Sequence, residues 1–118
     1  MPSGYNRAKR VGVLIQEELS RILLKETGDP RLKSVTITEV KMSKDLRIAK
    51  IYFTTMGNKQ EKTKSLTALK KAGGYLKHQM GEKLELRYMP ELFFYIDESL
   101  EYGEHIENLL KEVLKDDK

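Results

Sequence analysis

The stretch Ala68-Leu69-Lys70-Lys71-Ala72-Gly73-Gly74-Tyr75 lies in the middle of the chain, where a helical pattern meets two glycines and then resumes. The residues from Lys59 to Lys71 are rich in Lys, Ala and Leu, which favour a helix, and no turn residue follows Tyr75 until Gly81. Adjacent glycines cost about 1 kcal/mol each in a helix interior. We therefore predict two helices that meet in a kink at Ala72-Gly73-Gly74.

Two explanations of these glycines remain open. The first is a helix C-terminus, where Gly readily adopts the left-handed conformation. The second is that small side chains let another backbone approach closely, while the free N–H groups of the next helix favour an anion. Lys70, Lys71 and Lys77 flank this point, so the second explanation predicts a cradle for a nucleic-acid backbone.

Length and composition indicate one soluble domain. The 118 residues suffice for a single core, so we expect one domain over 1–118, with a flexible start at 1–5 and a flexible end at 115–118. The chain has no Cys, and its two His residues are 27 positions apart, so we expect no metal site. No apolar run of about 18 residues and no apolar signal core occur, which predicts a cytoplasmic protein.

The charge is divided unevenly along the chain. Residues 1–96 hold 19 Lys and Arg against 10 Asp and Glu, whereas residues 97–118 hold 3 against 8. A basic body attracts phosphate backbones, and an acidic end can limit non-specific binding or face a basic partner protein. An ordinary mixed surface is the alternative explanation of the same pattern.

Outward from the glycines, the pattern predicts further elements on both sides. Upstream, a helix with Asn6 as its N-cap runs to Thr27 and is stopped by Gly28-Asp29-Pro30. Two β-branched stretches, Val35–Met42 and Leu46–Thr54, then form an antiparallel hairpin. Downstream, a third strand covers 84–96 and a last helix begins at Ser99. The expected order is therefore α-β-β-α-α-β-α, an α+β fold whose mixed three-stranded sheet has helices packed on one face.

The second strand has two different faces. Ala49, Ile51 and Phe53 can point toward the helices, whereas Tyr52 shares the other face with Lys50 and Ile48. An aromatic side chain beside a cation on an open sheet face could stack bases, or it could simply fill the surface. Other aromatic residues are expected to act mainly in packing: Tyr88, Phe93 and Phe94.

Cations cluster on the first helix and at the glycines. Positive charge at a helix N-terminus is unfavourable by a few tenths of a kcal/mol, so its presence there suggests contact with an external anion, although ordinary surface residues would look the same. We predict that six cations contact phosphate groups of RNA: Arg7, Lys9, Arg10, Lys70, Lys71 and Lys77.

Two long motifs resemble a known family. Leu86-Arg87-Tyr88-Met89-Pro90-Glu91-Leu92, followed by Phe94, Asp97, Ser99, Leu100, Gly103, Ile106 and Leu109-Leu110, resembles the strand and final-helix motif of ribosome-binding factor A. Asn6-Arg7, Ile15-Gln16-Glu17-Glu18-Leu19 and Asp29-Pro30-Arg31 are similar to that family's opening helix and turn. Ala72-Gly73-Gly74 matches the Ala-x-Gly form that replaces the Gly-x-x-Gly loop of KH domains in this family.

The resemblance implies a type II KH-like fold and a non-enzymatic assembly factor. It implies binding to the free small (30S) ribosomal subunit and to 16S rRNA, a role in maturation of that RNA, and adaptation to cold. The residues agree with the lack of catalysis, because no Gly-rich phosphate loop and no nucleophile arrangement occurs. We expect no cofactor, no small-molecule substrate, no membrane contact and a monomer.

Two other classes of function remain open. A free-standing KH-like module would bind short RNA oligonucleotides nearly as well as assembled subunits. A protein adaptor would use the acidic last helix and would bind its partner after nuclease treatment. Comparing the two ligands, or repeating a pull-down without RNA, distinguishes these alternatives.

Overall fold

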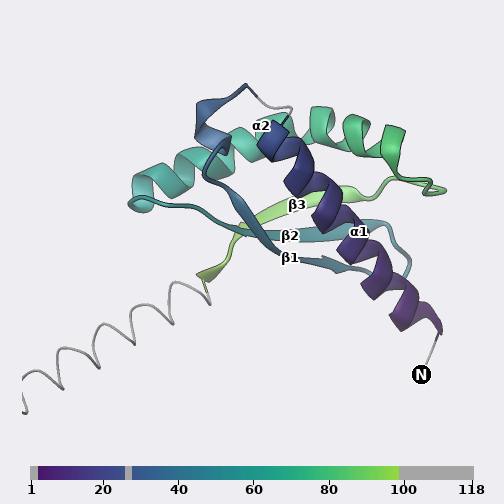
Figure 1. Ribbon diagram of the computed structural model, residues 1–118. Coiled ribbons are helices and arrows are strands. Elements are labelled where there is room, and N and C mark those ends of the chain that lie inside the picture. Colours follow the sequence, from purple (N-terminus) through teal and green to yellow (C-terminus); the bar gives the residue numbers. More distant parts are fainter. Residues whose placement is uncertain (1–2, 26–27, 99–118) are drawn as a thin grey trace, which may run out of the picture.

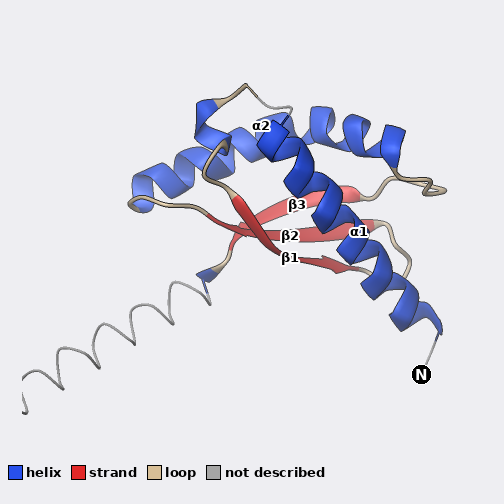
Figure 2. Ribbon diagram, viewed as in Figure 1, coloured by secondary structure: helices blue, strands red, loops and turns tan. Residues whose placement is uncertain are grey.

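A computed structural model of the chain describes residues 3–25 and 28–98. Two helices lie on the same side of one three-stranded sheet (Figures 1 and 2). The described elements are α1 (Ser3–Lys25), a 3₁₀ turn η1 (Pro30–Leu32), β1 (Thr36–Met42), β2 (Ile48–Thr54), α2 (Lys59–Lys83) and β3 (Glu91–Ile96). The last helix predicted from Ser99 and the flexible end predicted at 115–118 lie outside the described residues.

The sheet is mixed, as predicted. Its strands are ordered β1-β2-β3; β1 pairs with β2 antiparallel, and β2 pairs with β3 parallel. A parallel pair needs a long crossover connection, and α2 supplies it. The prediction of helices on one face is also confirmed, and it leaves the other face of the sheet without a covering element in the described part of the chain (Figure 1).

The core forms where the sheet meets the helices. Ala49, Ile51 and Phe53 alternate along β2 and are fully buried, which confirms the predicted inward face. The apolar stripe of α1 contributes Ile15 and Leu19, also fully buried. Side chains of a strand alternate between its two faces, and side chains on one face of a helix recur every three to four residues. The inward residues of β2 and α1 therefore pack together in one apolar layer.

Helix α1 lies unusually close to β1 at Gly12. A Cβ atom added there would stand 2.7 Å from the carbonyl oxygen of Val40, a backbone atom that has little freedom to move. Four residues later, the side chain of Gln16 donates hydrogen bonds to the carbonyl oxygens of Ile37 and Thr38 at 3.1 and 3.3 Å. The strand has an irregular register there, between Ile37 and Glu39, so the two bonds from Gln16 attach α1 to β1 at this irregularity.

Two element boundaries differ from the predictions. α1 begins at Ser3, so the predicted cap at Asn6 is wrong, whereas the flexible start over 1–5 stays a prediction. β3 begins only at Glu91 instead of Leu84. Pro90 has no N–H group to donate to the ladder, and the first bond across to the hairpin is from the Glu91 N–H to the Arg47 carbonyl at 2.8 Å.

The predicted boundary between two helices is absent. α2 is one helix from Lys59 to Lys83, and neither Gly73 nor Gly74 has positive φ, so these glycines do not end a helix. Buried side chains on both sides of the glycines, including Leu69 and Leu76, hold the two halves against the core. The ribbon of α2 rises through its first half and descends through its second, so the helix is bent and not broken (Figure 1).

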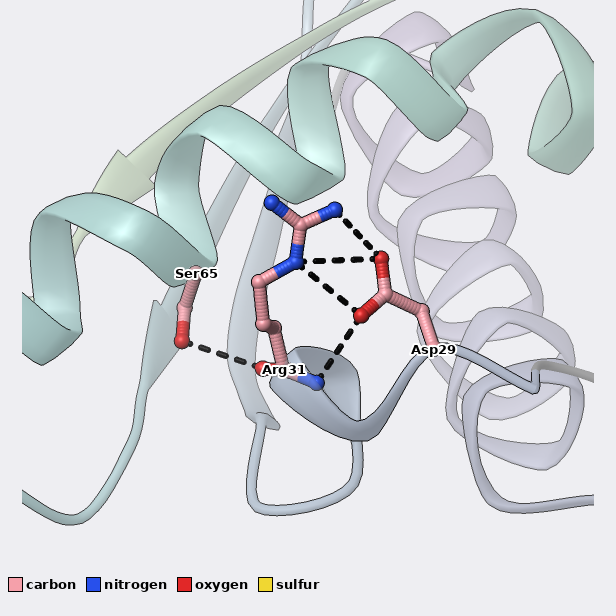
Figure 3. A network of polar contacts seen from close by, with 3 residues as sticks. All are labelled: Asp29, Arg31 and Ser65. Atoms are coloured by element: carbon pink, nitrogen blue, oxygen red, sulfur yellow. Dashed lines mark hydrogen bonds and ion pairs between the residues drawn. The ribbon is translucent and has the colours of Figure 1, made fainter.

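A polar network fastens the turn after α1 to α2 (Figure 3). The Asp29 carboxylate accepts a hydrogen bond from the Arg31 N–H at 2.9 Å and pairs with the Arg31 guanidinium at 2.7 Å. These bonds from Arg31 hold the pKa of Asp29 below its usual value. The buried Ser65 hydroxyl of α2 donates to the Arg31 carbonyl at 3.1 Å. The Asp29-Pro30-Arg31 turn thereby fixes where α2 begins to cross the sheet.

Candidate nucleic-acid interface

A groove runs between the middle of α2 and the edge strand β3. It has a volume of about 280 Å³ and is lined by Lys70, Gly73 and the four consecutive residues 92–95. We call it the β3 groove. Because β3 ends the sheet, one side of its backbone has no neighbouring strand in the described fold. Lys70 supplies a cation on the α2 side of this groove, and of its β3 residues Phe93 and Tyr95 are 47% and 41% exposed.

The glycines of α2 face open space. A Cβ atom added at Gly73 or Gly74 would have no neighbouring heavy atom within 4 Å. No backbone of the described residues therefore approaches these two glycines closely. Nothing in the described fold requires glycine here, although each costs about 1 kcal/mol of helix propensity. Ala72 differs from them, because its side chain is half-buried against the core.

The three predicted cations of α2 have different surroundings. Lys70 and Lys71 are exposed, and Lys70 lines the β3 groove. Lys77 is half-buried and makes an ion pair with Glu91 at 2.9 Å, which ties α2 to the first residue of β3. A phosphate contact by Lys77 would have to compete with this carboxylate.

A second groove lies beside the first half of α1, where the β1–β2 hairpin and the segment after α2 meet. We call it the hairpin groove; its volume is about 410 Å³. Four cations line it, against two acids, Asp45 and Glu85. The cations come from three separate parts of the chain: Arg7, Lys44, Arg47 and Arg87.

One acid of the hairpin groove has a structural role. The Asp45 carboxylate accepts hydrogen bonds from the Ser43 hydroxyl at 2.6 Å and from the Arg47 N–H at 3.1 Å. The Ser43 bond is the largest cause that holds the pKa of Asp45 below its usual value, so this carboxylate remains charged at neutral pH. It closes a tight turn in which Leu46 has φ of 62°, a conformation that L-residues rarely adopt.

Two of the six predicted phosphate contacts line a groove, one in each. Arg7 lines the hairpin groove and Lys70 lines the β3 groove, while Lys9 and Arg10 are exposed on α1. Sequence reasoning missed three cations of the hairpin groove: Lys44, Arg47 and Arg87. No local pattern marks them, because only the tertiary fold brings the hairpin and the segment after α2 next to Arg7.

Two aromatic residues predicted to pack are exposed instead. Tyr88 is 67% exposed in the hairpin groove and Phe93 is 47% exposed on β3, so the packing role predicted for both is wrong. Phe94 is only 4% exposed and belongs to the core, as predicted. Successive side chains of a strand point to opposite faces, which explains why Phe93 and Phe94 differ.

Comparison with known proteins decides the family. A family model described as ribosome-binding factor A matches residues 7–110. The ribosome-binding factor A of Desulfatibacillum aliphaticivorans is 48% identical over 107 residues, which cover 91% of this chain and 87% of that protein. The chain belongs to the ribosome-binding factor A family.

Structures of ribosome-binding factor A proteins share the fold. A solution structure of a putative ribosome-binding factor A from Thermotoga maritima has a TM-score of 0.67 and 33% identity, covering 75% of this chain and 85% of that one. A homology model of the Thermus thermophilus factor, fitted into a cryo-EM map of a 30S complex, has a TM-score of 0.65 and 22% identity, covering 77% and 96%. The fold of this family member is thus the predicted α+β, type II KH-like one.

Among residues 3–25 and 28–98, no group of three or more His, Asp or Glu side chains could hold a metal ion. Over the same residues, no helix is both long and apolar enough to cross a membrane.

Proposed function

We propose that this chain is a non-enzymatic assembly factor that binds the free small ribosomal subunit through 16S rRNA. It acts in late maturation and processing of that RNA, including at low temperature, as a cytoplasmic monomer without a cofactor. The β3 groove and the hairpin groove are its RNA contacts, with Arg7, Lys9, Arg10, Lys70, Lys71 and Lys77 at or beside them.

The open surface of α2 next to the β3 groove is the observation that carries this proposal. Gly73 and Gly74 leave room that no described protein atom uses, and Lys70 stands beside that room. An approaching phosphate backbone would use both the space and the charge. The name of the family, and the 30S complex into which the Thermus thermophilus model is fitted, support the small subunit as the bearer of that backbone.

Cosedimentation with separated small subunits, large subunits and intact ribosomes tests the proposal. We expect the chain to pellet with free small subunits and to remain in solution with the other two. Loss of pelleting when a short RNA oligonucleotide is added as a competitor would favour a free-standing RNA module instead. Pelleting that survives nuclease treatment of the subunits would favour a protein adaptor.

Salt dependence tests the individual phosphate contacts. A variant that lacks one phosphate contact releases fewer counterions when it binds. Lys70→Ala and Arg7→Ala should therefore each reduce the magnitude of the slope of log affinity against log salt by about 0.7 to 0.9. Small-subunit affinity measured between low and moderate salt gives this slope. Lys33→Ala is the matched control, because this exposed lysine lines neither groove. Slopes that match the wild type in both groove variants would remove these residues from the interface.

A further inference from the structure

The face of the sheet turned away from α1 and α2 carries aromatic rings and lysines. We call it the outer face. Alternation along the strands places Lys50 and Tyr52 of β2 on it, together with Phe93 and Tyr95 of β3. The parallel register sets Lys50 beside Phe93 and Tyr52 beside Tyr95. In the described part of the chain both helices lie on the other side, and Ile48, Phe93 and Tyr95 are each at least 40% exposed.

The rings on this face are held in order. The centroids of Tyr52 and Tyr95 are 5.5 Å apart with an interplanar angle of 28°, so the two rings are stacked. The ammonium group of Lys41, on β1, lies 5.4 Å from the centroid of the Tyr52 ring. Rings fixed on a sheet form a platform on which unpaired bases can stack, because every base has a π face and the platform has lost its rotational freedom before binding.

Lys41 and Lys50 of the outer face have no acidic partner among residues 3–25 and 28–98. Lys41 and Lys50 are directly opposite each other across the antiparallel ladder, an arrangement that destabilises a sheet. Neither makes an ion pair with another described residue. Of the acids on this face, Glu91 is held by Lys77, and Glu39 stands opposite Tyr52. A phosphate group between the two lysines would relieve their repulsion.

We propose that the outer face binds single-stranded RNA, with bases stacked on the ring surfaces of Tyr52, Tyr95 and Phe93 and phosphates held by Lys41 and Lys50. The ligand is a single strand because the bases of a duplex are already stacked on each other and cannot lie on the platform. This rests on the proposed function and deepens it: the small-subunit RNA would offer an unpaired segment to this face in addition to the backbone held at the grooves.

The test uses the full chain and a mixed-sequence RNA of about 12 nucleotides, single-stranded or paired with its complement. Tyr95→Leu keeps an apolar side chain but removes the π face, so it should weaken binding of the single strand about fivefold or more and leave duplex binding unchanged. Lys50→Gln should lower the salt slope for the single strand by about 0.7. Tyrosine fluorescence should be quenched on binding, and the chain has no Trp to mask it.

Glu39→Gln is the matched control on the same face. This substitution removes a negative charge beside the platform, so it should raise the affinity for the single strand, whereas Lys50→Gln should lower it. If these side chains only stabilised the sheet, the two substitutions would not change RNA affinity in opposite directions. Wild-type affinity for the single strand in both Tyr95→Leu and Lys50→Gln, with wild-type melting, overturns the proposal. If both variants keep wild-type affinity for the single strand but self-associate differently in sedimentation, the outer face is a protein-binding surface. That outcome also overturns the proposal.

Failure here is distinguishable from failure of the proposed function. If the wild type cosediments with small subunits but the outer-face variants bind the oligonucleotide normally, only the outer-face proposal is rejected. Oligonucleotide binding that depends on Tyr95, without any small-subunit cosedimentation, supports the outer face and rejects the assembly-factor role.

Discussion

Replacing Phe94 by alanine should lower the free energy of unfolding by about 3–5 kcal/mol, the usual range for deleting a buried aromatic side chain. Phe94 is 4% exposed, and its backbone pairs with Ile51 at the centre of the sheet, so the cavity would open under α2. Urea unfolding should show a lower midpoint with an unchanged slope.

Phe93→Ala is the matched control, one residue earlier on the same strand. Phe93 is 47% exposed, so its removal should change stability far less than that of Phe94. The outer-face proposal adds that Phe93→Ala should melt nearly normally and yet bind single-stranded RNA more weakly. A Phe94→Ala protein as stable as Phe93→Ala would contradict the core assignment of Phe94.

Gly12→Ala should destabilise the protein by about 1–3 kcal/mol, although alanine is the better helix former. The added methyl group would stand 2.7 Å from the Val40 carbonyl oxygen, so α1 must move away from β1. That movement would also lengthen the hydrogen bonds from Gln16 to the irregular part of β1. Thermal or urea unfolding measures the change.

Gly73→Ala supplies the comparison in the other helix. Open space surrounds this position, so alanine should raise stability by up to about 1 kcal/mol through helix propensity alone. The same Gly→Ala substitution should therefore lower the free energy of unfolding at position 12 and raise it at position 73. If Gly12→Ala were as stable as the wild type, the close approach of α1 to β1 would not constrain this position.

Much of the fold follows from local patterns. The stripe of α1 and the alternation of Ala49, Ile51 and Phe53 repeat at the periods of a helix and a strand, so their buried faces were predictable. The break expected at Gly73-Gly74 was wrong because propensity is a weak influence beside the burial of Leu69 and Leu76, which holds both halves of α2 on the sheet. The start of β3 was placed too early, although Pro90 cannot donate to the ladder and the first bond to the hairpin comes from Glu91.

The candidate site was less accessible from sequence. Lys70 and the glycines were found because they are adjacent in the chain, and Arg7 because it begins a basic cluster. Lys44, Arg47 and Arg87 were missed, since they reach Arg7 only through the folding of distant segments. Tyr88 and Phe93 were assigned to packing because they are aromatic, although strand alternation already puts Phe93 on the face opposite Phe94.

The sequence by itself determined the family, the mixed three-stranded sheet with helices on one face, and the basic character of the body. These features depend on residue type and spacing along the chain, so they can be predicted from the sequence. Only the tertiary structure decided that Gly12, and not Gly73 or Gly74, is where two backbones meet, and that cations divide between two grooves. Distances between segments far apart in sequence decide both questions, and those distances exist only after the helices have packed on the sheet.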